Sequence, residues 1–283
     1  PPHLHFPTAM QAFEVGKHVI CEKPLVTSLA HADALIEAAE AASKKLYPVF
    51  QYRYGLAMAR LSALQRAGLT GKPYAAALET HWNRGSDYYD IDWRGTWDGE
   101  NGGAVLGHAI HNHDLITRIL GPIKRVSAFT ATRVNPIETE DCAAISLQME
   151  SGALVTSSIT LGAAQDKTRL QLCFEHLTAT SGSDPYNPAI GDWTFVARNP
   201  QKQPYVDAII DSIQSVQAGY SGFFAAIADD LSGRSADVVT GEDGRRSIEL
   251  VAAIYHAART QSVVELPLTK GHALYDSLKP SDA

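Results

Sequence analysis

Apolar and polar positions along the first 54 residues follow the order helix, strand, helix, strand. Residues 3–15 carry apolar side chains at helical spacing, and Gly16 is a typical stop. The short apolar run 18–21 (HVIC) is typical of a strand buried on both faces of a parallel sheet. The alanine-rich run 28–45 predicts a second helix, and 47–54 (YPVFQYRY) predicts a second strand. This alternation indicates an α/β segment with parallel strands.

The pattern changes after Tyr54, where long strands follow one another with few intervening helices. Strands are expected at 72–83, 124–134, 141–152, 154–162, 168–181 and 192–199. Helices are expected within 56–71, stopping near Gly68, and at 104–120, 204–233 and 241–262. Such an order predicts a mixed, largely antiparallel sheet, open on one face and with helices on the other. The fold class is therefore α/β plus α+β, with a domain boundary close to Tyr54, so that residues 1–54 and 55–283 form separate domains.

Two parallel strands are too few for an independent α/β domain, because such a sheet needs more neighbours and helices on both faces. We therefore expect further strands before Pro1. Three cysteines, Cys21, Cys142 and Cys173, are far apart and form no CxxC motif. This usage favours a reducing compartment and a cytoplasmic protein without a disulfide or zinc framework.

Charge and hydropathy limit the classes of partner. The 283 residues include 24 Lys and Arg against 31 Asp and Glu, a net charge of −7, with no basic block. Nucleic acid and anionic membranes are therefore not expected partners. The longest apolar runs fall far short of the ~20 residues that a membrane span requires.

A charged pair follows the first predicted strand, where Glu22 and Lys23 precede Pro24. Ligands of open α/β sheets bind beyond the carboxyl ends of the strands. A lysine there can hold a substrate hydroxyl or carbonyl and pass a proton, especially if burial lowers its pKa. The structural alternative is a solvated ion pair at a strand-to-helix turn.

Residues 101–115 (NGGAVLGHAIHNHDL) gather three histidines and one aspartate. On a helix His108 and His111 share a face, Asp114 continues it, and His113 points elsewhere. The shared face could bind a metal, although histidines on zinc-binding helices more often stand four apart. A general base oriented by a neighbouring group is the second functional interpretation. A polar helix start packed against tyrosines is the structural one.

An aromatic loop precedes this helix. Its prominent members are Trp82, Tyr88, Tyr89, Trp93, Arg94 and Trp97. Aromatic side chains beside a site commonly line a pocket for sugar rings or other small polar ligands, and the same residues could form an ordinary loop core. Arg53 could reach the same cleft or pair with a carboxylate.

Four stretches, in order, resemble the glucose–fructose oxidoreductase / inositol 2-dehydrogenase / rhizopine catabolism (Gfo/Idh/MocA) family of NAD(P)-dependent oxidoreductases. Residues 1–25 resemble the late part of its Rossmann domain, with the Glu-Lys-Pro signature. Residues 52–73 resemble the crossover into the second domain, and 101–122 resemble the glycine-led helix that bears the family histidine. Residues 241–268 resemble the closing helix and strand. The four stretches together span nearly the whole chain.

The resemblance implies a function and a site. Lys23 would contact the reacting hydroxyl or carbonyl near the nicotinamide, within a cofactor-binding Glu22-Lys23-Pro24 segment, and His111 would be the acid/base. Candidate substrate contacts are Arg53, Trp93, Arg94, His108 and Asp114. The cofactor would be NAD or NADP and the substrate a sugar, cyclitol or related polyol. The glycine-rich phosphate loop would lie before Pro1, since no G-x-G-x-x-G follows a strand here. The open sheet would form a homodimer or homotetramer.

One position departs from the family pattern. Members commonly carry an aspartate four residues before the histidine, and this chain has Gly107 there, next to His108. A catalytically silent regulator or partner subunit is therefore one alternative function. A lyase or glycosidase variant that recycles NAD is another. A metal-dependent hydrolase or isomerase built on His108, His111 and Asp114 is the third.

Overall fold

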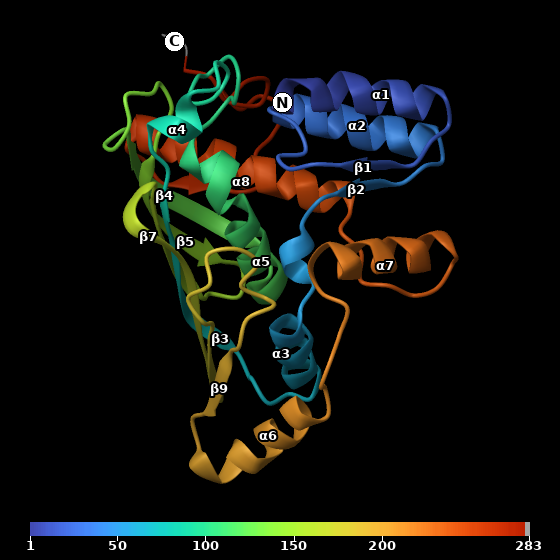
Figure 1. Ribbon diagram of the computed structural model, residues 1–283, viewed down its shortest axis with the longest axis vertical. Coiled ribbons are helices and arrows are strands. Elements are labelled where there is room, and N and C mark those ends of the chain that lie inside the picture. Colours follow the sequence, from blue (N-terminus) through green and yellow to red (C-terminus); the bar gives the residue numbers. More distant parts are fainter. Residues whose placement is uncertain (281–283) are drawn as a thin grey trace.

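The computed structural model describes residues 1–280 and contains two sheets (Figure 1). The smaller sheet pairs two short parallel strands, β1 and β2, in the register Val19 to Leu46. The elements of this part are η1 (Pro2–Leu4), α1 (His5–Glu14), β1 (Val19–Cys21), α2 (Leu29–Ala41), β2 (Leu46–Pro48) and η2 (Gln51–Arg53). Helices α1 and α2 lie on one side of the two strands, and α8 (Gly241–Thr260) packs against β2 and α2.

Local sequence explains most of these boundaries. Helix α1 ends where Gly16 takes a φ of +69°, a conformation that glycine adopts without strain. Helix α2 begins at Ser28, whose hydroxyl accepts a hydrogen bond from the N–H of His31 at 3.2 Å. The predicted strand 47–54 is wrong beyond Pro48. There β1 has already ended at Cys21, whose carbonyl oxygen accepts a hydrogen bond from the N–H of Val49 at 2.8 Å, and the chain then turns into η2 with Tyr52 buried.

The larger sheet confirms the predicted mixed, largely antiparallel architecture. Its eight strands run in the order β10-β4-β5-β6-β3-β7-β8-β9, and β3 with β6 is the parallel pair. They are β3 (Pro73–Asn83), β4 (Ile123–Ala131), β5 (Cys142–Met149), β6 (Leu154–Thr160), β7 (Gly162–Phe174), β8 (Leu177–Thr180), β9 (Thr194–Ala197) and β10 (Val264–Glu265). Inner positions alternate with outer ones, so each strand buries one row of side chains.

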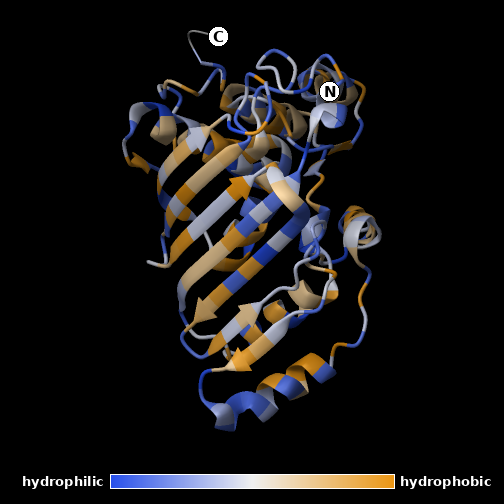
Figure 2. Cartoon of the chain, turned by 60° about the vertical axis from the view of Figure 1, so that its left-hand side comes forward, coloured by the Kyte–Doolittle hydropathy of each residue, from blue (hydrophilic) through white to orange (hydrophobic). Residues whose placement is uncertain are grey.

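Helices cover one face of this sheet, and Figure 2 looks onto the other face, where no described helix crosses the long strands. The covering and flanking elements are α3 (Leu56–Arg66), α4 (Ser86–Tyr89), η3 (Val105–Ala109), α5 (Ile110–Leu120), η4 (Pro200–Lys202), α6 (Gln203–Asp211), α7 (Gly219–Leu231) and α8. Large apolar side chains stay exposed on the strands, with Phe129 at 72% and Leu154 at 60%. Within residues 1–280 no helix has the length and apolar character of a membrane span.

Two of the predicted helices are interrupted. The segment 104–120 begins with a π-helical turn, η3, before it continues as α5. The segment 204–233 divides into α6 and α7, because residues between them leave helical geometry around Gly219, whose φ is +57°. The domain boundary at Tyr54 stays a prediction.

Candidate active site

Lys23 lies just beyond the carboxyl end of β1 and reaches the helix that bears the histidines. Its Nζ donates a hydrogen bond to the carbonyl oxygen of Gly107 at 2.7 Å. Burial lowers the pKa of this ammonium group, and the carboxylates of Glu22 and Glu100 partly offset the effect. Among the residues described, Lys23 forms no ion pair, so the solvated Glu22–Lys23 pair is not what the structure contains.

The histidine-bearing helix starts at two closely packed glycines. A Cβ at Gly103 would lie 1.9 Å from the carbonyl oxygen of Glu140, and one at Gly102 would lie 2.6 Å from the hydroxyl of Tyr255. The Glu140 carboxylate accepts hydrogen bonds from the N–H groups of Gly103 at 3.1 Å and Val105 at 2.9 Å, and from the Tyr255 hydroxyl. The buried Glu140 side chain therefore accepts hydrogen bonds from N–H groups at the helix start that would otherwise lack partners.

The π turn η3 places Gly107 beside Lys23. Turns of this kind widen a helix and occur frequently at functional sites. A Cβ at Gly107 would meet no atom within 4 Å, so the position faces open space. The space next to the bond between Lys23 and Gly107 is therefore available to a ligand group.

His111, on α5, packs against the aromatic rings of Tyr52 and Phe50. Its ring stacks on Tyr52, with centroids 4.3 Å apart and planes at 21°, and meets the edge of Phe50 at 5.8 Å. Burial, and then the Lys23 ammonium, lower the pKa of His111 well below its ordinary value. Its Nδ1 is buried without a hydrogen-bond partner in residues 1–280. His111 is therefore a neutral imidazole that can accept a proton.

His108 lies in an aromatic wall. Its ring is 5.5 Å from that of Trp82 and 5.5 Å from that of Tyr88. Burial lowers the pKa of His108 to about 3, assisted by the cations Lys23, Arg84 and Arg94. The aromatic loop thus contributes both to this wall and to the core, because Trp97 is buried and packs edge-on against Tyr255, at 5.6 Å.

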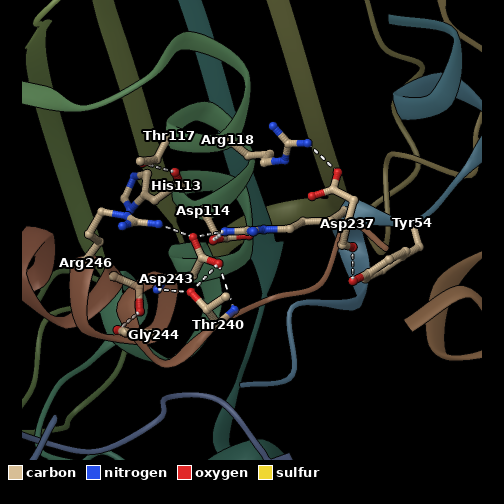
Figure 3. A network of polar contacts seen from close by, with 12 residues as sticks. Tyr54, His113, Asp114, Thr117, Arg118, Asp237, Thr240, Asp243, Gly244 and Arg246 are labelled. Carbon is tan, nitrogen blue, oxygen red and sulfur yellow. Dashed lines mark hydrogen bonds and ion pairs between the residues drawn. The ribbon is translucent and has the colours of Figure 1, made fainter. Parts of the chain in front are cut away.

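Arg53 and Asp114, both predicted substrate contacts, pair with each other. Figure 3 shows Asp114 together with Asp243 and Arg246, which belong to the same network. The Arg53 Nε donates to one Asp114 oxygen at 2.7 Å and Nη2 to the other at 2.5 Å. Nη2 is also 3.0 Å from Asp243, which in turn pairs with Arg246. The network borders a pocket of about 490 Å³ that His113 and Arg118 also line. Their role in substrate binding stays a prediction, and pairing with a carboxylate is the structural alternative.

Asp114 does not join the histidines as a ligand set. Burial raises the pKa of its carboxyl group, and Arg53 opposes that rise. Within residues 1–280, no three His, Cys, Asp or Glu side chains lie close enough together to hold a metal ion. The geometry around His108 and His111 therefore gives the metal-dependent alternative no support.

Three further polar residues join the site without a local sequence signal. They are Arg84, Glu100 and Glu140. Burial raises the pKa of Glu100, whose carboxylate accepts a hydrogen bond from the N–H of Gly95 at 2.6 Å. Each reaches the site through contacts with distant parts of the chain, which spacing along the sequence does not show.

A nicotinamide cofactor fits one end of this arrangement. The Glu22-Lys23-Pro24 segment follows the carboxyl end of a parallel strand, where dinucleotides bind in such sheets, and open space lies beside Lys23 at Gly107. His111 follows Gly107 by four residues on the same helical segment, and its pKa is lowered by burial and by the Lys23 ammonium. These residues suit the nicotinamide end, while the 283 residues contain no G-x-G-x-x-G loop for the pyrophosphate.

The fold and this site together define an NAD-binding oxidoreductase, with part of a Rossmann domain joined to a mixed-sheet domain. The family model "Oxidoreductase family, NAD-binding Rossmann fold" matches residues 1–50, and the "GFO/IDH/MocA C-terminal domain" matches residues 58–180. The chain belongs to the Gfo/Idh/MocA family, as the sequence resemblance predicted.

Curated relatives include enzymes that act on sugars and polyols. D-apiose dehydrogenase of Paraburkholderia graminis is 25% identical over 281 residues, covering 93% of this chain and 70% of that protein. Myo-inositol 2-dehydrogenase of Thermotoga maritima is 26% identical over 159 residues, or 54% of this chain and 45% of that protein. An uncharacterised oxidoreductase of Synechocystis is 28% identical, and the match spans 46% of its length.

Solved structures of similar fold include complexes with NADH. The WlbA dehydrogenase of Bordetella pertussis, in complex with NADH and UDP-GlcNAcA, is 26% identical with a TM-score of 0.81, covering 95% of this chain and 78% of that one. Levoglucosan dehydrogenase in complex with NADH has a TM-score of 0.75 at 20% identity, which shows a shared fold.

Proposed function

We propose that the protein transfers a hydride between NAD or NADP and the CH–OH or carbonyl carbon of a sugar, cyclitol or related polyol. Lys23 and His111 are the substrate-binding and acid–base pair. The observation that carries the proposal is the hydrogen bond from Lys23 to the carbonyl oxygen of Gly107, four residues before His111, beside open space at Gly107.

The chemistry follows from these two groups. In the oxidation direction the Lys23 ammonium donates a hydrogen bond to the substrate oxygen and stabilises the negative charge that develops on it. Neutral His111 accepts the hydroxyl proton as the carbonyl double bond forms. A nicotinamide bound beside Glu22-Lys23-Pro24 would supply the hydride acceptor, so that the hydride would leave the substrate carbon while His111 holds the hydroxyl proton. In the reduction direction the protonated His111 returns the proton.

Relatives support the substrate class. The D-apiose and myo-inositol dehydrogenases act on polyhydroxylated compounds, and the Bordetella WlbA structure holds NADH with a nucleotide sugar. In this chain, the half-buried Tyr88 beside His108 offers an aromatic side chain against which a sugar can pack.

The test is NADH or NADPH formation by the full-length protein with a panel of sugars and cyclitols. Lys23→Ala is expected to lower kcat by at least about 100-fold, as loss of a group that acts in the transition state does, with little change in the Kd for NAD. Unchanged turnover in Lys23→Ala would remove the lysine from the mechanism. Arg198→Gln, an exposed arginine outside the site, is the matched control.

A non-catalytic regulator or partner subunit is the second candidate, and Gly107 is the observation that favours it. Without a side chain there, the relay that the family aspartate would support is absent from this position. NAD binding with no turnover across the whole panel would support this candidate over the dehydrogenase.

We also propose that the open face of the large sheet pairs with a second copy of the chain as a homodimer or homotetramer. Exposed apolar side chains such as Phe129 and Leu154 gain from being covered. Light scattering of the protein eluted from a size-exclusion column is expected to give two or four times the mass of one chain. Phe129→Glu is expected to shift that mass to the monomer.

A further inference from the structure

Positive charge gathers around the aromatic wall of the site. The Arg94 guanidinium lies 3.9 Å from the centroid of the Tyr88 ring, and that of Arg84 lies 5.6 Å from it. With Lys23, these two cations face His108, whose pKa they lower further after burial. The part of the site in which a sugar would rest therefore carries three cations.

The two arginines differ in how their donors are satisfied. Arg84 pairs with Asp166 at 3.0 Å and donates to the Tyr186 hydroxyl at 2.8 Å. Arg94 donates from Nη1 to the Tyr88 carbonyl oxygen at 3.2 Å. Its Nε is buried and has no partner within residues 1–280, and none of the ion pairs in that range includes Arg94. Of the two arginines, Arg94 is thus the one with unused hydrogen-bonding capacity.

The carboxylates near the cluster do not pair with Arg94. Asp166 pairs with Arg84 and accepts a hydrogen bond from the Tyr186 hydroxyl. Glu100 accepts a hydrogen bond from the N–H of Gly95 at 2.6 Å and forms no ion pair with Arg94 within residues 1–280. An unpaired guanidinium in a partly buried site is costly on its own, and it is well matched in geometry to a planar carboxylate or a phosphate.

We propose that Arg94 recognises an anionic group on the substrate, so that the protein acts on acidic sugars in preference to neutral ones. The anion is a carboxylate or a phosphate attached to the sugar. This inference rests on the proposed dehydrogenase function and names its substrate class.

The experiment compares matched neutral, carboxylate and phosphate forms of the same hexoses. Glucose, glucuronate and glucose 6-phosphate form one set, and the galactose and mannose series form two more. Turnover is measured as kcat and KM for the full-length wild-type protein, Arg94→Gln, Arg94→Lys and the control Arg198→Gln. Calorimetric binding of the same compounds with NADH present gives a second readout that does not depend on turnover.

At least one anionic form is expected to exceed its neutral partner by 10-fold or more in kcat/KM. Arg94→Gln is expected to remove that preference, mainly through KM, by lowering kcat/KM for the anionic form at least 10-fold more than for the neutral one. Arg94→Lys is expected to restore part of the preference. Comparison of kcat/KM between the carboxylate and phosphate forms of each hexose identifies the anion. Equal kcat/KM or Kd for neutral and anionic forms, or an equal loss on both in Arg94→Gln, would overturn the inference. Absence of turnover with every compound would count against the dehydrogenase, and the calorimetric comparison would then still decide the preference for anions.

Discussion

The ammonium group of Lys23 lies 2.7 Å from the carbonyl oxygen of Gly107, 84 positions further along the chain. This hydrogen bond joins the turn after β1 to the π turn that leads into His111. It connects a segment matched by the Rossmann family model to one matched by the C-terminal-domain model. The acid–base pair of the proposed mechanism is thus assembled from both parts of the chain.

Two glycines of the π-turn region are expected to respond oppositely to alanine. Gly107→Ala meets open space in a helix and is expected to raise the free energy of unfolding by about 0.5–1 kcal/mol. Gly103→Ala places a methyl group 1.9 Å from the Glu140 carbonyl oxygen and is expected to lower it by about 3 kcal/mol. Urea unfolding of both variants measures the difference. Similar values for the two would contradict the close approach at Gly103.

The low pKa of His111 predicts a particular pH profile. A histidine whose pKa lies well below 6.5 stays neutral, and therefore able to accept a proton, through pH 8 to 6. The kcat/KM for oxidation is expected to show no acid limb from this group in that interval. His111→Gln should lower kcat by about 10²–10⁴-fold, whereas the exposed His176→Gln should not. An acid limb near pH 6.5 that disappears in His111→Gln would refute the assigned environment.

Glu140 is expected to make folding stability depend on pH. Burial raises the pKa of its carboxyl group to about 7, above the ~4.3 of an exposed glutamate, so the folded protein holds the proton more tightly than the unfolded chain does. The stabilisation is complete below about pH 4, falls as the pH rises, and is lost above about pH 7. Urea midpoints between pH 4.5 and 8 should therefore decline less steeply in Glu140→Gln than in the wild type. Parallel curves would show that Glu140 does not titrate in this range.

The buried network around Arg53 is expected to matter more for stability than an exposed pair does. Arg53→Met leaves Asp114 and Asp243 close together without their shared cation, which should cost about 3–5 kcal/mol. Arg234 pairs with Asp229 on the surface, and Arg234→Met should cost at most about 1 kcal/mol. Denaturant unfolding at pH 7 compares the two. A small loss in Arg53→Met, with lower affinity for substrate, would instead support the predicted role of Arg53 as a substrate contact.

Periodicity and capping signals along the sequence determined the order of helices and strands. Ser28 and Gly16 act on their immediate neighbours, so their effects can be read locally. The strand predicted for 47–54 failed because its length depends on the partner, β1, which ends at Cys21. The order of motifs likewise determined the family, because Glu22-Lys23-Pro24 and the glycine-led histidine helix follow each other in the family's order.

The tertiary structure decided which polar groups meet. Interactions between remote segments bring three polar residues to the site: Arg84, Glu100 and Glu140. Asp114 pairs with Arg53, although its helical spacing aligned it with His111. Local propensity depends on neighbours within a few residues, so sequence patterns indicate elements and motifs. Burial, pKa and ion pairing depend on what packs from elsewhere in the chain, and these properties arise only when the sheets and helices are assembled.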